Sequence, residues 1–299
     1  MKNQIFRGIM PALITPVNVD NTVREDSVRR LIEHHISKGV SGFYICGSTG
    51  EGPALSEETR RHMAEIVVDQ VAGRVAVINH VGAPDAQSAI RLARHAEEIG
   101  CDAISSVPPT FYYSYGDDEI FNYYRALSEN CKKPLLVYAT GMFKQADIVP
   151  FIDRLMALDT VIGLKFTRYN YYEMHRIAEL NGGDINVING PDEMLLCGLS
   201  MGAQAGIGST YNVMAGEFVK LYNCFAGGDW MGAQAQQYKI NHVIEIMLRH
   251  GLFPALKHML TVQGFDAGYP VFPCRRFSAA EEKAFMDDLN AVRFFEDYE

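Results

Sequence analysis

The stretch Val161-Ile162-Gly163-Leu164-Lys165 is a short, continuous apolar run that ends on a lysine. Continuous rather than alternating apolarity is typical of a strand covered on both faces, as in a parallel sheet. Similar β-rich runs occur elsewhere along the chain: Ile9–Ile14, Gly42–Cys46, Val75–Asn79, Ala103–Ser106, Leu135–Tyr138, Ile185–Asn189 and Gln204–Gly206. Together they predict a set of eight buried, parallel strands.

Helical patterns fill the gaps between these runs, most of which begin about 25–33 residues apart, the length of one βαβ unit. Apolar residues recur at helical spacing in Arg24–Lys38, Ser56–Val71, Asp85–Glu98 and Asp117–Glu129. Ser56 and Asp85 are suitable N-caps, and Gly39 is a suitable terminator. Eight strands alternating with helices favour a (β/α)8 TIM barrel over a doubly wound sheet.

The chain from Val213 onward shows helical patterns and no further strand-like run. Helices are predicted over Trp230–Arg249 and Pro254–Gln263 and from about Ser278, with a Gly/Pro-rich loop at Gly264–Pro273. No low-complexity linker separates these helices from the barrel. We therefore expect a catalytic barrel over residues 1–225 and a C-terminal helical extension over residues 226–299.

Composition narrows the classes of partner. The 299 residues are 48% hydrophobic and 21% charged, an ordinary globular balance, with a formal net charge of −9 and no Lys/Arg-rich run. We therefore expect no nucleic-acid partner. No stretch approaches the ~20 apolar residues of a membrane span, and the first residues lack the apolar core of a signal peptide. The expectation is a cytoplasmic protein without a membrane partner.

Metal and nucleotide motifs are not evident in the sequence. The six cysteines lie far apart without a Cys-x-x-Cys pair, so we expect reduced thiols, most of them buried. The nine histidines show no metal-ligand spacing. Gly206-Ile207-Gly208-Ser209-Thr210-Tyr211 has Tyr where a dinucleotide loop needs its third Gly. No metal site and no cofactor are predicted.

Active sites of TIM barrels lie at the C-terminal ends of the strands, so the residues that end each run are the candidates. They are Gly47-Ser48-Thr49-Gly50-Glu51, Pro108-Pro109-Thr110-Phe111-Tyr112-Tyr113, Tyr138, Lys165-Phe166-Thr167, Asn189-Gly190-Pro191-Asp192-Glu193, and Gly206 to Thr210.

Lys165 is the most informative of these residues. Burial disfavours the charged form of an amine, and a neutral amine can attack a carbonyl to form a Schiff base. The alternative is a structural lysine that reaches solvent at the strand end or pairs with Glu51. Its position alone leaves both interpretations open.

The other strand ends supply groups that a Schiff-base lysine needs. Ser48 and Thr49, between glycines, offer hydroxyls and backbone N–H groups for a carboxylate, although the same residues also suit a flexible turn. Tyr138 can relay a proton or simply pack in the core. Asp192 and Glu193 can bind a polyol or begin a helix, where carboxylates are favoured.

Taken together, these motifs resemble the pyruvate-dependent class I aldolase family that contains dihydrodipicolinate synthase and N-acetylneuraminate lyase. The resemblance runs from about Arg7 to Phe277 and rests on Gly47-Ser48-Thr49-Gly50-Glu51, Val137-Tyr138 and Gly163-Leu164-Lys165-Phe166-Thr167. Ser48, Asn189-Gly190-x-Asp192-Glu193, Gly206 to Asn212 and Phe253 are most similar to the N-acetylneuraminate lyase branch.

The resemblance implies a role for each candidate residue. Lys165 would form the Schiff base with pyruvate, Tyr138 would relay protons, and Tyr112 would reach Tyr138 across a subunit interface. Ser48 and Thr49 would hold the pyruvate carboxylate. The residues implied to bind the sugar hydroxyls are Thr167, Gly190, Asp192, Glu193 and Ser209.

Two stretches depart from the family pattern. Ala139-Thr140-Gly141 replaces the Asn-Ile-Pro that usually follows the tyrosine in the lyases, and the loop after it is also different. The Pro108–Tyr113 stretch is one residue longer than expected, so Tyr113 is an alternative to Tyr112. No arginine lies in residues 139–144, where the synthase holds the carboxylate of its second substrate.

The implied reaction is cleavage of a 2-keto-3-deoxy sugar acid, N-acetylneuraminate first among them, to pyruvate and an aldehyde sugar. The iminium would act as the electron sink, so the mechanism implies no metal or organic cofactor. The family association implies a homotetramer. Two alternatives remain open: another aldolase of the family, including a dihydrodipicolinate synthase-like enzyme, and a non-catalytic sensor of pyruvate or sugar acids.

Overall fold

The computed structural model describes residues 2–109 and 113–298. Its eight strands form one parallel sheet in the order β1-β8-β7-β6-β5-β4-β3-β2. They are β1 (Gly8–Pro11), β2 (Gly42–Ile45), β3 (Ala76–His80), β4 (Ala103–Ser106), β5 (Leu135–Ala139), β6 (Val161–Phe166), β7 (Asn186–Asn189) and β8 (Ala205–Gly208).

The two edge strands meet and close the sheet into a barrel. Ala12 and Tyr44 form a parallel bridge between the end of β1 and β2. The backbone N–H of Leu13 donates to Tyr44 O at 2.9 Å, and that of Ser41 donates to Ile9 O at 2.8 Å. Because closure removes the unpaired edges, the strands can be short.

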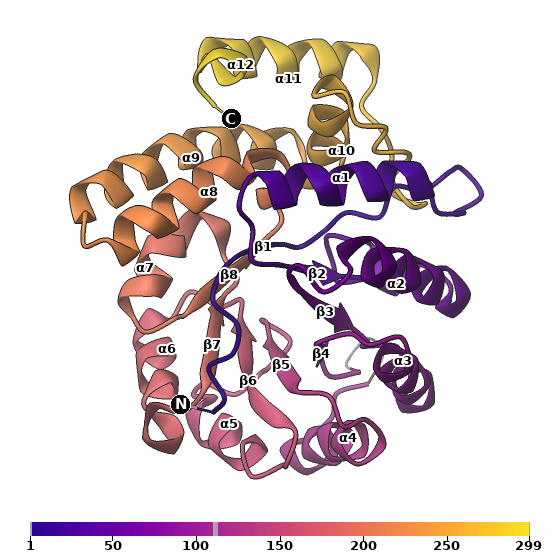
Figure 1. The fold of residues 1–299 in the computed structure, drawn as a ribbon, viewed down its shortest axis with the longest axis vertical. Coiled ribbons are helices and arrows are strands. Elements are labelled where there is room, and N and C mark those ends of the chain that lie inside the picture. Colours follow the sequence, from indigo (N-terminus) through magenta and orange to yellow (C-terminus); the bar gives the residue numbers. More distant parts are fainter. Residues whose placement is uncertain (1, 110–112, 299) are drawn as a thin grey trace.

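Helices surround the barrel, as Figure 1 shows. They are α1 (Glu25–Ser37), α2 (Glu57–Val71), α3 (Ala86–Glu98), α4 (Asp117–Asn130), α5 (Val149–Leu155), α6 (Tyr171–Ala178), α7 (Leu195–Ser200) and α8 (Tyr211–Ala226), with short 3-10 turns at Gly52–Ala54, Leu180–Gly183 and Asp192–Met194. The predicted caps are confirmed: Ser56 accepts from Thr59 N, and Asp85 accepts from Ser88 N.

The apolar residues divide into two layers. One layer fills the barrel and includes Met10, Ile78, Leu136, Ile188 and Ile207. The larger layer lies between the strands and the helices, because successive side chains of a strand point to opposite faces of the sheet. This two-sided burial explains why the runs are continuously apolar.

Four further helices follow the barrel: α9 (Trp230–His250), α10 (Leu252–Val262), α11 (Ala279–Ala291) and α12 (Phe294–Asp297). Helix α9 packs against α8, and both α10 and α11 contact α9. In Figure 1 they lie outside α1 and α8, on one side of the barrel. The buried Phe285 and Leu289 face this packing from α11.

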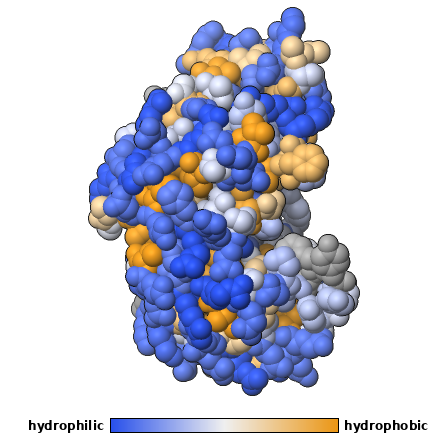
Figure 2. All heavy atoms as spheres, turned by 90° about the vertical axis from the view of Figure 1, so that its right-hand side faces the viewer, coloured by the Kyte–Doolittle hydropathy of each residue, from blue (hydrophilic) through white to orange (hydrophobic). Residues whose placement is uncertain are grey.

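The predicted strands and helices are confirmed, with ends that differ by up to three residues. The six cysteines are free, as expected, but only Cys46, Cys101 and Cys131 are buried. The expectation of mostly buried thiols is wrong for Cys197 and Cys274, which lie exposed on the surface. None of the helices in the described residues is long and apolar enough to cross a bilayer. The face in Figure 2 is mainly hydrophilic, with small scattered hydrophobic areas.

Candidate active site

Lys165 and Tyr138 are register neighbours on adjacent strands, so their side chains lie side by side inside the barrel mouth. The pairing of β5 with β6 places Tyr138 opposite Lys165. Lys165 is 5% exposed and Tyr138 is 6% exposed. The two residues that carry most of the predicted chemistry are therefore brought together, both largely shielded from water.

Two tyrosine rings form the walls around the Lys165 amine. Lys165 Nζ lies 4.4 Å from the centroid of the Tyr138 ring and 4.5 Å from that of the Tyr44 ring. The rings themselves meet edge-on, with centroids 5.9 Å apart. Aromatic faces attract a cation and tolerate a neutral amine, so they position Nζ without pairing it to a carboxylate.

The Tyr138 phenol has an altered acidity. Burial by itself would raise the pKa of Tyr138, but the charge of Lys165 and the Ser48 hydroxyl outweigh burial and lower it. The Thr167 hydroxyl also lies near the phenol, although Thr167 Oγ1 makes no hydrogen bond of regular geometry with the described residues. A phenol with a lowered pKa is better suited to accept and return a proton.

Tyr44 was not predicted as part of the site, although it lies in the predicted run 42–46. Its ring is fully buried, and its hydroxyl donates to Ser105 Oγ at 3.2 Å. The sequence could have indicated this position, because side chains alternate along a strand and Tyr44 is the large inward-facing side chain of β2.

The His80 ring packs against both tyrosine rings, and Arg60 binds the backbone of His80. Burial lowers the pKa of His80 to about 3, so its imidazole is neutral, and its ring meets Tyr138 edge-on at 6.0 Å. The Arg60 guanidinium is buried and donates to His80 O at 2.7 Å and Gly82 O at 2.9 Å. Arg60 lies on the buried face of α2, three residues before Met63. This helical spacing could have indicated a buried arginine, but Arg60 was not predicted as part of the site.

The loop after β2 is held in a specific conformation rather than a flexible turn. Cys46 and Glu51 at its two ends have positive φ angles of 57° and 55°. Backbone strain of this kind persists only where the surroundings enforce it. Gly50 O accepts a 2.6 Å hydrogen bond from Thr15 Oγ1. The Thr49 and Ser209 hydroxyls lie 2.6 Å apart, joining the loops after β2 and β8.

Glu51 pairs with Lys257 of α10 and not with Lys165. Lys257 Nζ lies 2.7 Å from Glu51 Oε2, and both side chains are almost fully buried. Glu51 Oε1 also accepts from the Val271 N–H at 2.8 Å. The alternative of a Lys165–Glu51 pair, left open by the sequence, is therefore wrong.

Asp192 follows β7 and is buried beside the end of β8. Its Oδ2 accepts from the Thr210 N–H at 2.7 Å and from the Thr210 hydroxyl at 2.6 Å. Burial raises the pKa of Asp192 to about 6, an effect that the Thr210 bonds and the Lys165 charge reduce. Asp192 also begins a 3-10 turn, so the structural interpretation of this carboxylate holds beside the functional one.

Gly190, Thr167 and Glu193 lie next to Asp192. A Cβ on Gly190 would stand 2.0 Å from Thr167 Oγ1 and 2.8 Å from Phe166 O, so only glycine fits between these strand ends. Glu193 Oε1 is half-buried and accepts a 2.5 Å hydrogen bond from the Tyr169 hydroxyl. The candidates after β6, β7 and β8 thus gather at one rim.

The loop after β5, which departs from the family pattern, is held by contacts with Arg168 and Glu173. Arg168 Nη1 donates to Phe143 O at 2.9 Å, and its Nε lies 2.9 Å from the buried Glu173. Glu173 also accepts from the Ile148 N–H at 3.0 Å. Lys144 Nζ donates to Ser114 Oγ at 2.9 Å, which ties the loop to the segment before α4.

Tyr112 lies outside the described residues, which end at 109 and resume at 113. Tyr113, the alternative to it, is 70% exposed. In the part of the chain that the structure describes, no three or more His, Cys, Asp or Glu side chains gather as a metal site would require.

Comparison with known proteins gives a consistent result. The model of the dihydrodipicolinate synthetase family matches residues 5–292. An N-acetylneuraminate lyase of Rhizobium meliloti (strain 1021) is 34% identical over 287 residues, which cover 96% of this chain and 95% of the relative.

Solved structures agree with this match. The N-acetylneuraminate lyase of Proteus mirabilis superposes with a TM-score of 0.90 at 29% identity, over 97% of this chain and 99% of that one. A catalytic-lysine mutant of the sialic acid aldolase of Ruminococcus gnavus superposes with a TM-score of 0.91 at 25% identity, over 98% and 96% of the two chains.

Proposed function

This chain belongs to the dihydrodipicolinate synthetase family of pyruvate-dependent aldolases, and from that premise we propose that it cleaves N-acetylneuraminate to pyruvate and an aldehyde sugar through a Schiff base on Lys165. Carbon–carbon lyase chemistry is common to the family. The substrate is proposed from the N-acetylneuraminate lyases that match nearly the whole chain.

The observation that carries the assignment is the placement of the Lys165 amine. It lies between the Tyr44 and Tyr138 rings at the barrel mouth, 5% exposed, without a carboxylate partner among the described residues. An amine in such a setting is available for attack on a ketone. Lys257, the other buried lysine described, is instead occupied by Glu51.

The proposed sequence begins with attack of the Lys165 amine, in its neutral form, on the C2 ketone. Tyr138 then gives its proton to the departing hydroxyl, so that water leaves and a protonated imine and the Tyr138 phenolate remain. The protonated imine then draws the electrons of the C3–C4 bond. Tyr138 takes the proton of the C4 hydroxyl as that bond breaks and the aldehyde leaves. The enamine that remains is protonated at C3 and hydrolysed, which releases pyruvate and regenerates the amine.

The substrate carboxylate is assigned to Ser48 and Thr49. Thr49 is held by its 2.6 Å contact with Ser209, and Ser48 lies beside the Tyr138 phenol. Fixing the carboxylate places the keto carbon against the amine, which lowers the entropic part of the barrier. The sugar hydroxyls are assigned to Thr167, Gly190, Asp192, Glu193 and Ser209.

A second candidate is an aldolase of the same chemistry that acts on a different 2-keto acid. It is favoured by the Ala139-Thr140-Gly141 segment and by the loop that Arg168 anchors, because these residues differ from those usual in the lyases. A screen that measures pyruvate release from several 2-keto-3-deoxy acids separates the two candidates.

Borohydride reduction in the presence of pyruvate, followed by peptide mass mapping, tests the chemistry. We expect one reduced adduct, on Lys165, and none in Lys165→Met. An adduct on Lys257, or no adduct at all, would overturn the mechanism. An adduct on Lys165 without turnover of any keto acid would instead identify a pyruvate sensor.

We also propose a cytoplasmic homotetramer, in which Tyr112 of one subunit approaches Tyr138 of another. The exposure of the adjacent Tyr113 is compatible with a covered face at this segment. Light scattering of the purified chain gives the assembly size, and a monomeric, fully active chain would contradict it.

A further inference from the structure

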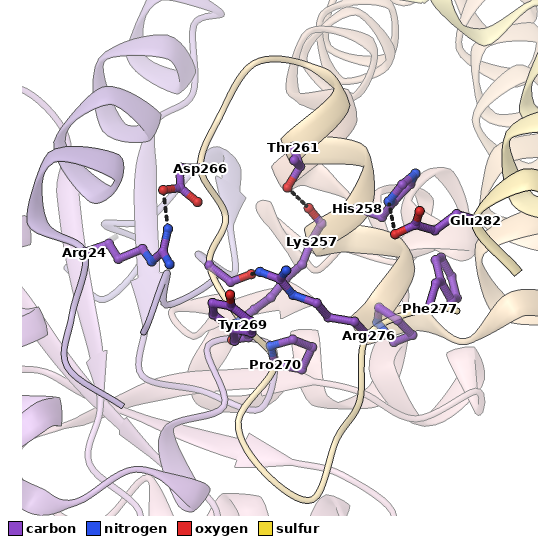
Figure 3. Close-up of a pocket in the computed structure, with 12 residues that line it drawn as sticks. Arg24, Lys257, His258, Thr261, Asp266, Tyr269, Pro270, Arg276, Phe277 and Glu282 are labelled. Atoms are coloured by element: carbon purple, nitrogen blue, oxygen red, sulfur yellow. Dashed lines mark hydrogen bonds and ion pairs between the residues drawn. The ribbon is translucent and has the colours of Figure 1, made fainter. Parts of the chain in front are cut away.

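A cavity of about 330 Å³ lies between the start of α1, helix α10 and the segment 264–277 (Figure 3). The proposed mechanism does not use it. Acidic and basic side chains supply half of its lining: Arg24, Lys257, His258, Asp266, Arg276 and Glu282. Its volume falls at the lower end of the range of small-molecule sites.

Most of these charges already have a partner. Arg24 pairs with Asp266, Lys257 pairs with Glu51, and His258 Nδ1 lies 3.6 Å from Glu282. Arg276 differs, because within residues 2–109 and 113–298 no carboxylate pairs with it. Its Nη2 donates only to Gly268 O, at 2.9 Å.

Tyr269 holds the Arg276 guanidinium in place. The guanidinium carbon lies 3.5 Å from the centroid of the Tyr269 ring, and that of Arg24 lies 5.6 Å from the same ring. Figure 3 shows the two arginines reaching Tyr269 from different elements. A guanidinium stacked on a ring keeps its N–H edge free, in the geometry that binds a carboxylate or phosphate with two parallel hydrogen bonds.

Arg24 also carries a donor without an acceptor in the described part of the chain. Arg24 Nε is buried and has no hydrogen-bond partner among the described residues. The chain carries a net charge of −9, so the two arginines beside one ring are opposite in sign to its overall charge.

We propose that this cavity is a binding site for a small oxyanion, a molecule with a phosphate or carboxylate group held by Arg276 and Arg24. The group would receive N–H donors from Arg276 and the favourable charge of Arg24, and the remainder of the molecule would lie toward His258 and Thr261. No covalent step is involved.

The site adjoins the residues that hold the carboxylate-binding loop. Lys257 donates to the Tyr269 carbonyl and to Thr15 O, and it pairs with Glu51 at the end of that loop. An anion bound at Tyr269 would therefore alter the Lys257 contacts, which hold the loop that carries Ser48 and Thr49. We expect occupancy to change the KM for the keto acid, a consequence that rests on the proposed function, whereas binding does not.

Calorimetric titration of the full chain with inorganic phosphate and, separately, with malonate tests the proposal and distinguishes the two anion types. We expect at least one to bind, and Arg276→Gln to weaken binding by about tenfold or more. Arg275→Gln is the matched control, because the neighbouring Arg275 is exposed and pairs with Glu281. Ser48→Ala should bind the anion as the wild type does.

Thr261→Glu gives a second route to the same answer if Arg276→Gln disturbs the loop. Thr261 is an exposed residue of α10 that lines the cavity, so a carboxylate there should repel the anion with both arginines present. Absence of binding by both anions, or unchanged binding in Arg276→Gln and Thr261→Glu, would overturn the proposal.

Discussion

Lys257 Nζ and Glu51 Oε2 form a 2.7 Å ion pair that connects α10 of the C-terminal extension to the loop after β2. Burial lowers the pKa of Lys257, and Glu51 opposes that shift. Each member of this buried pair therefore depends on the other for its counter-charge. The C-terminal helices accordingly help to shape the barrel mouth, although they contribute none of the residues assigned to the chemistry.

Lys257→Met should destabilise the fold markedly, because it leaves the Glu51 carboxylate buried without a counter-charge. Breaking a buried pair in this way costs about 3–5 kcal/mol in the free energy of unfolding. Urea unfolding measures the loss, and Glu51→Gln in the same chain should restore part of it.

Lys283→Met is the matched control for Lys257→Met. Lys283 pairs with Asp287 at 2.6 Å, but both side chains are largely exposed. Exposed pairs contribute about 0–1 kcal/mol. Equal losses of stability in the two variants would contradict the importance given to burial of the Glu51 pair.

Tyr138→Phe should lower kcat by about 10²–10⁴-fold, because the ring beside Lys165 remains while the hydroxyl that we propose as the proton relay is lost. Tyr44→Phe keeps the other ring and removes a hydroxyl that bonds to Ser105. We expect less than about a tenfold change there. Steady-state kinetics measures kcat for both variants. An equally large loss of kcat in Tyr44→Phe would show that the hydroxyl of Tyr138 has no special role.

Asp192→Asn should remove one source of pH-dependent stability. Burial raises the pKa of Asp192 from its ordinary 3.8 to about 6 in the folded chain. Below pH 3.8 the group is protonated in both states, and its contribution is fully present. As pH rises toward and through 6, the unfolded state has already lost the proton that the folded state keeps, so stability falls by about 3 kcal/mol.

The measurement is the difference in unfolding free energy between Asp192→Asn and wild type at pH 4, 5, 6 and 7. Burial lowers the pKa of His35 and His80 to about 3, which gives an opposite trend common to both proteins. The difference isolates Asp192 and should shift in favour of the variant as pH rises. A constant difference would indicate an ordinary, solvated carboxylate.

Gly190→Ala should disturb the end of the site that we propose binds the sugar. Its Cβ would overlap Thr167 Oγ1 and crowd Phe166 O, and overpacking of this kind costs about 1–3 kcal/mol of stability. Gly141 has open space where a Cβ would be added, so Gly141→Ala should be nearly neutral. Thermal unfolding and KM measure both effects, and a neutral Gly190→Ala would argue against close contact between the β6 and β7 ends.

The barrel could be predicted because its determinants are local. Each strand is a run of a few residues buried on both faces, and Ser56 and Asp85 cap helices through bonds that span three residues. The end of each strand then locates its candidate residues at one mouth, which is why Lys165 and Tyr138 were found together. Tyr44 was missed because a large apolar ring in a buried run also looks like core packing.

The sequence by itself determined which side chains reach the mouth, since strand period and strand ends follow from neighbouring residues. Only the tertiary structure decided their partners. Glu51 binds Lys257 instead of Lys165, and Thr49 meets Ser209 across 160 residues. Such pairings depend on how the barrel closes and where the extension packs, and no local pattern encodes which distant charge or hydroxyl arrives at a given position.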